Sequence, residues 1–359
     1  MYNLLAGLRI YFKKQEIKYE SGIFRLSYMF TTAILIAASL MTTAVQYIGT
    51  PITCMNDGDV PINVINTYCW ISSTFTMPDS FNRKIGGEVA HPGLGNENGE
   101  RKYHAYYQWV CFVLFFQALF CYIPKWLWKS WEGNLMATLV MGMNSGLKTE
   151  EEKEEKKRVL IDYLLGHVKQ HTSYALRYFI CETLAWVNVM VQMYVMNRFL
   201  GGQFFSYGVY VTSYADEDQE SRSDPMIYVF PRVTKCTFHK YGSSGTITRH
   251  DALCVLPQNI INEKTYIFLW FWFIILWFLL TGLVIYRAAL LVWPRTRPKM
   301  LRARARYIPG EVIDVLSRKT DLGDWWILYN LGRNLEPLVY REVVSELAKK
   351  VETAASNAV

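Results

Sequence analysis

Four long stretches that are almost free of charged residues constrain this sequence more than any other feature. They lie within 26–56, 105–124, 178–197 and 265–286, and Glu182 is the one fully charged side chain inside them. Each is long enough to cross a hydrocarbon core of about 30 Å, which takes roughly 20 helical residues. Charged residues make up only 19% of the 359-residue chain, against about 25% in soluble domains. The sequence therefore predicts an all-α, polytopic membrane protein and excludes a soluble enzyme, a disordered chain and a small disulfide scaffold.

The four stretches divide the chain into nine segments with alternating environments. Pro124 is expected to end the second span, since a missing backbone donor is tolerated there. The expected segments are a cytoplasmic amphipathic helix (1–25), span one (26–48), an outside loop (49–104), span two (105–124), a helical inner loop (125–177), span three (178–198), a second outside loop (199–264), span four (265–286) and a helical tail (287–359).

The distribution of Lys and Arg predicts which segments face the cytoplasm. The N-terminal tail, middle loop and C-terminal tail together carry 27 of them, whereas the two remaining loops carry 10. Positive residues near spans favour the cytoplasmic side, so both termini and the middle loop are expected there. The middle loop and the C-terminal tail have helical apolar stripes and are expected to form a helical cytoplasmic dome. Topology thus explains the net charge of +7, and no nucleic-acid partner is expected.

Cysteine placement agrees with this orientation. Four cysteines lie in the two outside loops, where disulfides persist, and the sequence alone allows three pairings among them. They are Cys54, Cys69, Cys236 and Cys254. The other three, Cys111, Cys121 and Cys181, lie in spans and are expected to be buried thiols. The wide spacings, with no Cys-x-x-Cys pair, argue against a zinc site.

Several strings, together with this layout, resemble the innexins, the invertebrate gap-junction proteins. Tyr107, Gln108, Trp109 and Val110 form a string like the family signature, at the start of span two. Two cysteines per outside loop is the innexin count, whereas vertebrate connexins have three. Further strings resemble insect members: Ser73 to Pro78, Asp224 to Met226, Pro231 to Cys236, and Asp324 to Trp326.

The resemblance implies a gap-junction channel subunit in the plasma membrane. Known relatives form octameric hemichannels, two of which dock through their outside loops and pass ions and small metabolites between cells. The implied partners are further copies of the chain, the docked hemichannel of the adjacent cell, other innexins and membrane lipids; no cofactor is implied. In the family the disulfides run between loops, which implies Cys54 with Cys254 and Cys69 with Cys236.

Two other functions remain open at the level of sequence. One is a non-junctional hemichannel that releases small molecules such as ATP; the other is a four-span adhesion or scaffold protein like a claudin. Catalysis is not expected, because the chain has no His-Glu-x-x-His motif, P-loop or dinucleotide-binding fingerprint after a strand.

Span one has a polar stripe that is a candidate pore lining. At about 100° per residue, its members fall within an arc of about 120°. They are Thr31, Thr32, Ser39, Thr42, Thr43 and Gln46, with Leu35 as the main apolar member. The alternative is that the hydroxyls bond to their own helix or to a neighbouring one.

The N-terminal segment is a second candidate pore element, because Leu4, Leu5 and Leu8 share an apolar face. The default for such a helix is to lie in the membrane interface. The resemblance implies instead that the segment from Met1 to about Leu8 folds into the pore mouth as its constriction. The candidate lining residues there are Met1, Tyr2, Asn3, Leu4, Leu5 and Leu8.

Glu182 is the intramembrane charge of this chain, and such a carboxylate marks a functional site by default. The alternative is a structural role in which its side chain reaches toward Arg177.

Overall fold

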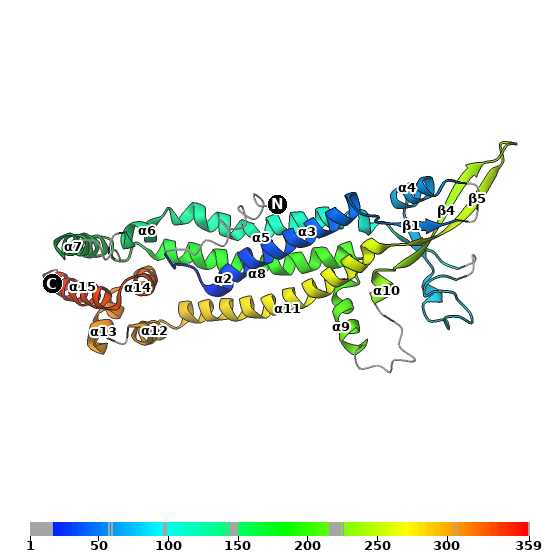
Figure 1. Ribbon diagram of the computed structural model, residues 1–359. Helices are drawn as coiled ribbons and strands as arrows, with labels where there is room; N and C mark the ends of the chain where they lie inside the picture. Colours follow the sequence, from blue (N-terminus) through cyan, green and yellow to red (C-terminus); the bar gives the residue numbers. More distant parts are fainter. Residues whose placement is uncertain are drawn as a thin grey trace. The chain divides into compact units, whose positions relative to one another are not determined.

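The computed structural model describes residues 17–56, 58, 60–95, 99–141, 143, 150–214, 224, 226–305 and 307–357 (Figure 1). The chain forms two compact units. One consists of Met1–Met29, Tyr122–Val187 and Phe278–Val359, and the other of Phe30–Cys121 and Asn188–Trp277. We call them the helical unit and the sheet unit.

Four helices in the described part of the chain are long and apolar enough to cross a membrane, as predicted. The first covers Gly22–Tyr47 and consists of α2 (Gly22–Arg25), a π-helical turn η1 (Leu26–Phe30) and α3 (Thr31–Tyr47). The others are α5 (Val110–Glu132), α8 (Thr172–Phe199) and α11 (Pro257–Val292). The chain is therefore a mostly helical four-span protein.

The helix that contains the second span does not end at Pro124, where the sequence analysis places the end of the span. Helix α5 continues through Pro124 to Glu132. A proline has no N–H to donate to the carbonyl four residues earlier, here that of Phe120. The amide of Asn188, on α8, donates to the Phe120 carbonyl oxygen at 3.2 Å instead. The replacement donor lets the helix pass through the proline with this carbonyl satisfied.

The sheet unit contains a five-stranded antiparallel sheet in the order β1-β5-β4-β2-β3. Its strands are β1 (Thr53–Met55), β2 (Thr74–Thr76), β3 (Lys102–His104), β4 (Val233–Tyr241) and β5 (Ile247–Val255). The sheet unit also contains five short helical elements. These are the helices α4 (Ile62–Ser72), α9 (Phe204–Tyr214) and α10 (Met226–Val229) and the 3₁₀ turns η2 (Pro78–Ser80) and η3 (Tyr106–Gln108). No strands are expected here from the sequence, so the sheet is an addition to the expected helical architecture.

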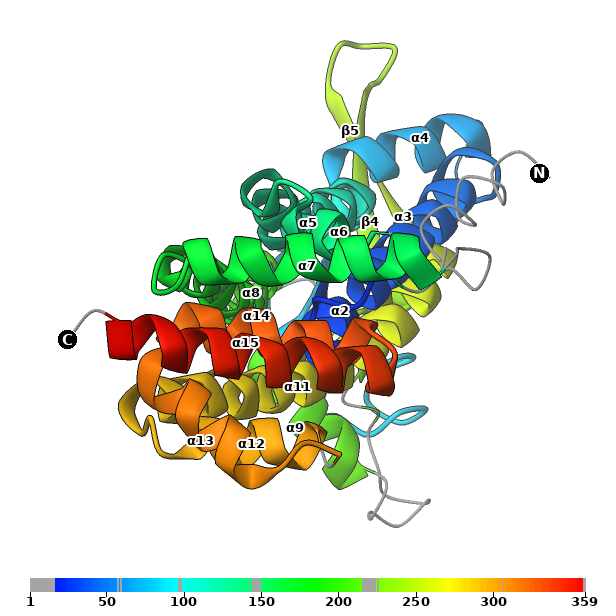
Figure 2. The same cartoon turned by 90° about the vertical axis from the view of Figure 1, so that its left-hand side faces the viewer.

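The helical unit gathers shorter helices from the two segments predicted to be cytoplasmic. These are α6 (Leu135–Val140), α7 (Glu150–Gly166), α12 (Thr296–Arg304), α13 (Gly310–Lys319), α14 (Leu322–Asn334) and α15 (Pro337–Asn357). Helices α7 and α15 lie side by side (Figure 2). Helix α14 is the core of this group, since Trp326, Ile327 and Leu331 on it are buried. A capping box of Asp321 and Asp324 fixes where it begins.

Candidate functional site

The polar stripe of the first span faces the interior of the sheet unit. Thr31, Thr32, Leu35, Ser39 and Thr42 are all buried there. Thr32 donates to the carbonyl oxygen of Ala118 at 3.4 Å and Ser39 to that of Cys111 at 2.8 Å, both on α5. Trp272 of α11 donates its indole N–H to the Thr31 hydroxyl at 3.0 Å.

These contacts match the alternative given for the stripe, and its pore-lining role stays a prediction. In this structure the hydroxyls join α3 to α5 and α11, which is the alternative given above. Thr43 bonds back to the Ser39 carbonyl at 2.7 Å and is half-buried. Gln46, also half-buried, accepts a weak bond from the Cys111 thiol at 3.4 Å. Helical spacing identified the shared face correctly but gave no information on what that face contacts.

The candidate constriction residues Met1 to Leu8 lie outside the described residues. The chain that follows them, Lys18 to Ser21, is held by side chains of the helical unit. Asn334 of α14 bonds both the N–H and the carbonyl of Lys18, at 2.5 and 2.9 Å. Arg333 donates to the Glu20 carbonyl at 3.0 Å. The stem of the N-terminal segment is thereby fixed to α14.

Glu182 pairs with Arg287, the residue that directly follows the predicted fourth span. The guanidinium Nε and Nη2 donate to the two carboxylate oxygens at 2.5 and 3.0 Å, a bidentate geometry. The carboxylate thus pairs with Arg287 and not with Arg177, the partner considered in the structural alternative above. Ser21 completes the site, since its hydroxyl donates to the Glu182 carboxylate at 2.7 Å. Glu182 is fully buried and Arg287 is only 7% exposed.

Aromatic rings surround the Arg287 guanidinium. Its Cζ lies 4.7 Å from the ring centroid of Trp326 and 4.9 Å from that of Phe179. The rings of Tyr178 and Tyr286 lie at 5.8 and 5.2 Å. Ring faces attract a cation and exclude water from it. The Arg287 charge therefore lies in apolar surroundings, with the Glu182 carboxylate as its counter-charge.

A second buried ion pair lies nearby in the same unit, between Lys125 of α5 and Glu20. Tyr28 donates its hydroxyl to the other Glu20 oxygen at 2.6 Å. This pair is not predicted from the sequence, because both residues lie in the polar flanks of spans. One signal in the sequence could have indicated the pair. Glu20 lies just before span one and Lys125 just after span two, and both of these span ends are expected at the cytoplasmic face of the membrane.

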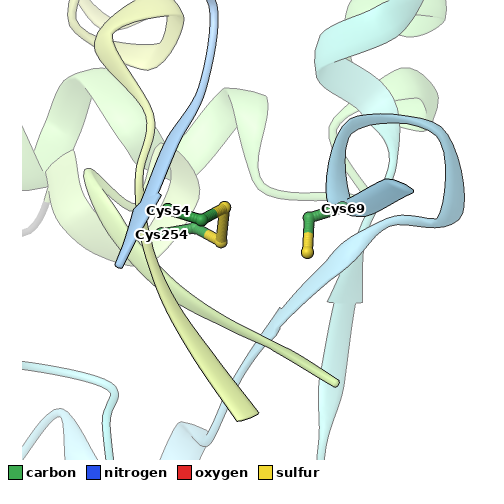
Figure 3. Close-up of side chains that lie close together, drawn as sticks. All are labelled: Cys54, Cys69 and Cys254. Carbon is green, nitrogen blue, oxygen red and sulfur yellow. A yellow bond between two sulfur atoms is a disulfide. The ribbon is translucent and has the colours of Figure 1, made fainter. Parts of the chain in front are cut away.

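Two disulfide bonds tie the two long loops together, Cys54–Cys254 and Cys69–Cys236. This is the pairing that the resemblance implies. Cys54 and Cys254 are direct cross-strand partners of β1 and β5, whereas Cys69 reaches β4 from α4. Figure 3 shows Cys69 beside the Cys54–Cys254 bridge. The sulfur atoms of these three lie within 4.8 Å of one another, but all belong to disulfides and so offer no thiolate to a metal.

The Tyr107–Val110 string connects the disulfide-linked layer to span two. Tyr107 is fully buried and donates to the carbonyl oxygen of Cys69 at 3.3 Å. Gln108 donates its amide to the carbonyl oxygen of Ile71 at 3.2 Å, at the end of α4. Trp109 is 59% exposed, and Val110 is fully buried as the first residue of α5. The string therefore positions α4 and its disulfide on the start of a membrane helix.

Comparison with known proteins identifies relatives over nearly the whole chain. The family model described as Innexin matches residues 20–351. Innexin inx1 of Schistocerca americana is 59% identical, covering 99% of both chains, and innexin inx1 of Drosophila melanogaster is 56% identical, covering 98% of both. Innexin shaking-B of Drosophila melanogaster is 48% identical, covering 98% of this chain and 95% of its own.

Proposed function

The chain belongs to the innexin family and is a gap-junction channel subunit, and we propose that it assembles into octameric hemichannels that dock between cells and conduct ions and small metabolites. Innexins are channel proteins rather than enzymes. The four apolar helices fit a multi-pass plasma-membrane protein. Both termini are proposed to lie in the cytoplasm, on the charge distribution given above.

The observation that carries the docking proposal is the disulfide-linked sheet. The β4–β5 hairpin extends past its neighbours, since β2 pairs with β4 only at Lys235 and β1 pairs with β5 only from Leu253 onward. Near its tip, Tyr241 and Ile247 are cross-strand partners and are 73% and 66% exposed. A rigid hairpin with exposed apolar side chains loses little conformational entropy on docking. We assign it to the contact with the opposite hemichannel.

The conducting pathway is proposed to include the first residues of the chain. Support comes from the stem at Lys18 to Ser21, which α14 and Glu182 hold at a fixed place. A segment attached to such a stem has a defined origin from which to enter a pore mouth. The half-buried Thr43 and Gln46 of α3 remain pore-lining candidates in this proposal.

Dual voltage clamp on paired cells that express only this chain tests the proposal, with unpaired cells recorded in parallel. We expect junctional current between pairs. The double substitution of Tyr241→Ser and Ile247→Ser is expected to abolish junctional current and to leave the current of unpaired cells intact. Val159→Ser is the matched control, because Val159 is equally exposed at 65% but lies on α7 of the helical unit.

Each outcome has a definite meaning. Junctional current that survives the double substitution contradicts the assignment of the hairpin. Current in unpaired cells with no junctional current in wild type indicates a hemichannel that releases small molecules. Surface expression without current in either configuration indicates that the chain needs a second kind of subunit to conduct, or that it is an adhesion or scaffold protein.

A further inference from the structure

Helix α9 carries no charged side chain, and one of its faces is exposed in the structure. Its residues Phe204 to Tyr214 include no ionisable acid or base other than tyrosine. Phe205, Val209 and Tyr210 are 46%, 57% and 56% exposed. In a soluble protein such a surface would normally carry charges. The exposed face of α9 therefore suits a partner that contacts apolar and aromatic side chains.

The opposite face of α9 is packed against α11 in the same unit. A Cβ added to Gly208 would lie 2.0 Å from the Trp270 ring, so the two helices touch at that glycine. Trp270 donates its indole N–H to the Phe205 carbonyl at 3.3 Å, and Tyr207 donates its hydroxyl to the Glu263 carbonyl at 3.3 Å. The contact fixes α9 at the level of residues 263–270 of α11.

With the topology proposed above, on which this inference rests, the charge pattern of α11 assigns that level to the outer boundary of the bilayer. Lys264 is the last charged residue of α11 before the uncharged run that begins at Thr265. Trp270 lies six residues further on, which is about 9 Å along a helix that rises about 1.5 Å per residue. Amphipathic helices at an interface bury their apolar face about 5–10 Å into the boundary between headgroups and acyl chains. Helix α9 thus lies at the depth where such helices are found.

The direction of α9 and its hydroxyl groups agree with that environment. Figure 1 shows α9 projecting from the side of α11 instead of continuing along it. The turn that redirects the chain after α8 uses Gly201 and Gly202, both with positive φ (65° and 84°). Thr212 donates to the Val209 carbonyl at 2.8 Å and Ser213 to the Tyr210 carbonyl at 3.1 Å. Hydroxyls that bond to their own helix need no water.

We propose that α9 is a membrane-embedded interfacial helix that inserts Phe205, Val209 and Tyr210 into the outer leaflet. Its partner is the lipid surface, specifically the boundary between headgroups and acyl chains. Because α9 has no Lys or Arg, its insertion depends on apolar contact and is independent of anionic lipid. The helix thereby attaches the second outside loop to the bilayer at the point where that loop leaves α8.

Depth-dependent fluorescence quenching on the full-length protein in lipid nanodiscs tests this proposal. A fluorophore is attached to Val209→Cys in a background in which the three free thiols, Cys111, Cys121 and Cys181, are replaced by serine. We expect blue-shifted emission that bromines high on the acyl chain quench more strongly than bromines near its methyl end. The matched control is Tyr241→Cys at the hairpin tip, which is expected to be unaffected by both lipids.

Two results would overturn the proposal. Emission at Val209→Cys that neither lipid quenches, with accessibility to a water-soluble quencher, would place α9 in water. Efficient disulfide cross-linking between subunits at Val209→Cys, without lipid quenching, would make α9 a subunit contact. Exchange of zwitterionic for anionic lipid is expected to leave the quenching unchanged. None of these readouts depends on channel current, so they are independent of the docking proposal.

Discussion

The Glu182–Arg287 ion pair allows a quantitative test of how the helical unit is held together. Replacing Glu182 by Leu leaves the Arg287 guanidinium buried among four aromatic rings without a counter-charge. Removing one partner of a buried pair costs about 3–5 kcal/mol, because the remaining charge stays desolvated. Arg287→Met removes the counter-charge of the carboxylate but leaves its hydrogen bond from the Ser21 hydroxyl, so it should also lower the free energy of unfolding, by less than Glu182→Leu does.

The double variant Glu182→Leu/Arg287→Met is expected to recover most of that loss. Replacing a buried pair by apolar side chains of similar volume is often neutral or stabilising. One acceptor is still lost, since the Ser21 hydroxyl donates to the Glu182 carboxylate at 2.7 Å. The hydroxyl keeps the bond that it accepts from the Phe24 N–H, but a donor left without an acceptor costs about 1–3 kcal/mol. The double variant should therefore unfold about 1–3 kcal/mol more easily than wild type, less than either single variant.

Chemical unfolding in detergent micelles, followed by tryptophan fluorescence, measures these differences. A loss of about 3–5 kcal/mol raises the unfolding equilibrium constant by roughly two to four orders of magnitude. The control is Arg302→Met, which removes a pair with Asp314 whose side chains are 47% and 42% exposed. An exposed pair contributes at most about 1 kcal/mol. The reasoning fails if Glu182→Leu costs no more than Arg302→Met, or if the double variant is the sum of the two single variants.

Three further predictions concern other parts of the molecule. Burial, aided by the charge of Lys102, lowers the pKa of His104 to about 4, so folding stability is complete above the unfolded pKa of about 6.5 and falls by about 3 kcal/mol as pH drops toward 4. Thermal unfolding against pH measures this, and His104→Gln should flatten the profile. Gly323→Ala should destabilise the helical unit by about 1–3 kcal/mol, because the added Cβ would lie 2.0 Å from the His171 backbone. Thermal unfolding measures this loss. Gly166→Ala is the control and should cause no such loss, because no atom lies within 4 Å of its added Cβ. Asn188→Leu should cost about 1–3 kcal/mol by unpairing the Phe120 carbonyl, and Pro124→Ala in the same chain should recover part of it; an equal loss with and without the proline contradicts our account of α5.

The positions of the spans were predictable from sequence because they depend on one quantity, the length of a run without charged side chains. A run such as 265–286 has no charge over 22 residues, and only a membrane or a large core accepts such a helix. The course of α5 past Pro124 was not predictable in the same way. It depends on the Asn188 amide, which lies 68 residues after Phe120 in sequence, and a local rule about proline contains no information on such a donor.

The sheet was hidden for a related reason. Strands β1, β2 and β3 have three residues each, which is too short for a period of two to be recognised. Their pairing is also non-local, since Cys54 lies opposite Cys254 at a separation of 200 residues. The β4–β5 hairpin was within reach of sequence analysis, because two β-branched, alternating runs flank a Gly-Ser-Ser-Gly turn at Gly242 to Gly245.

The same limit explains why Arg287 and Lys125 were missed as partners of Glu182 and Glu20. Both cations were counted toward topology, where their sign alone matters, and their pairing depends on which spans adjoin. In the structure, Lys18, Glu20 and Ser21 contact α14, α5 and α8 within the helical unit. Because two of these contacts involve buried ion pairs, this stem cannot move without exposing or separating charges. Displacement of the stem at Lys18 to Ser21 must therefore break these bonds or displace α14, so the stem and α14 are expected to move together.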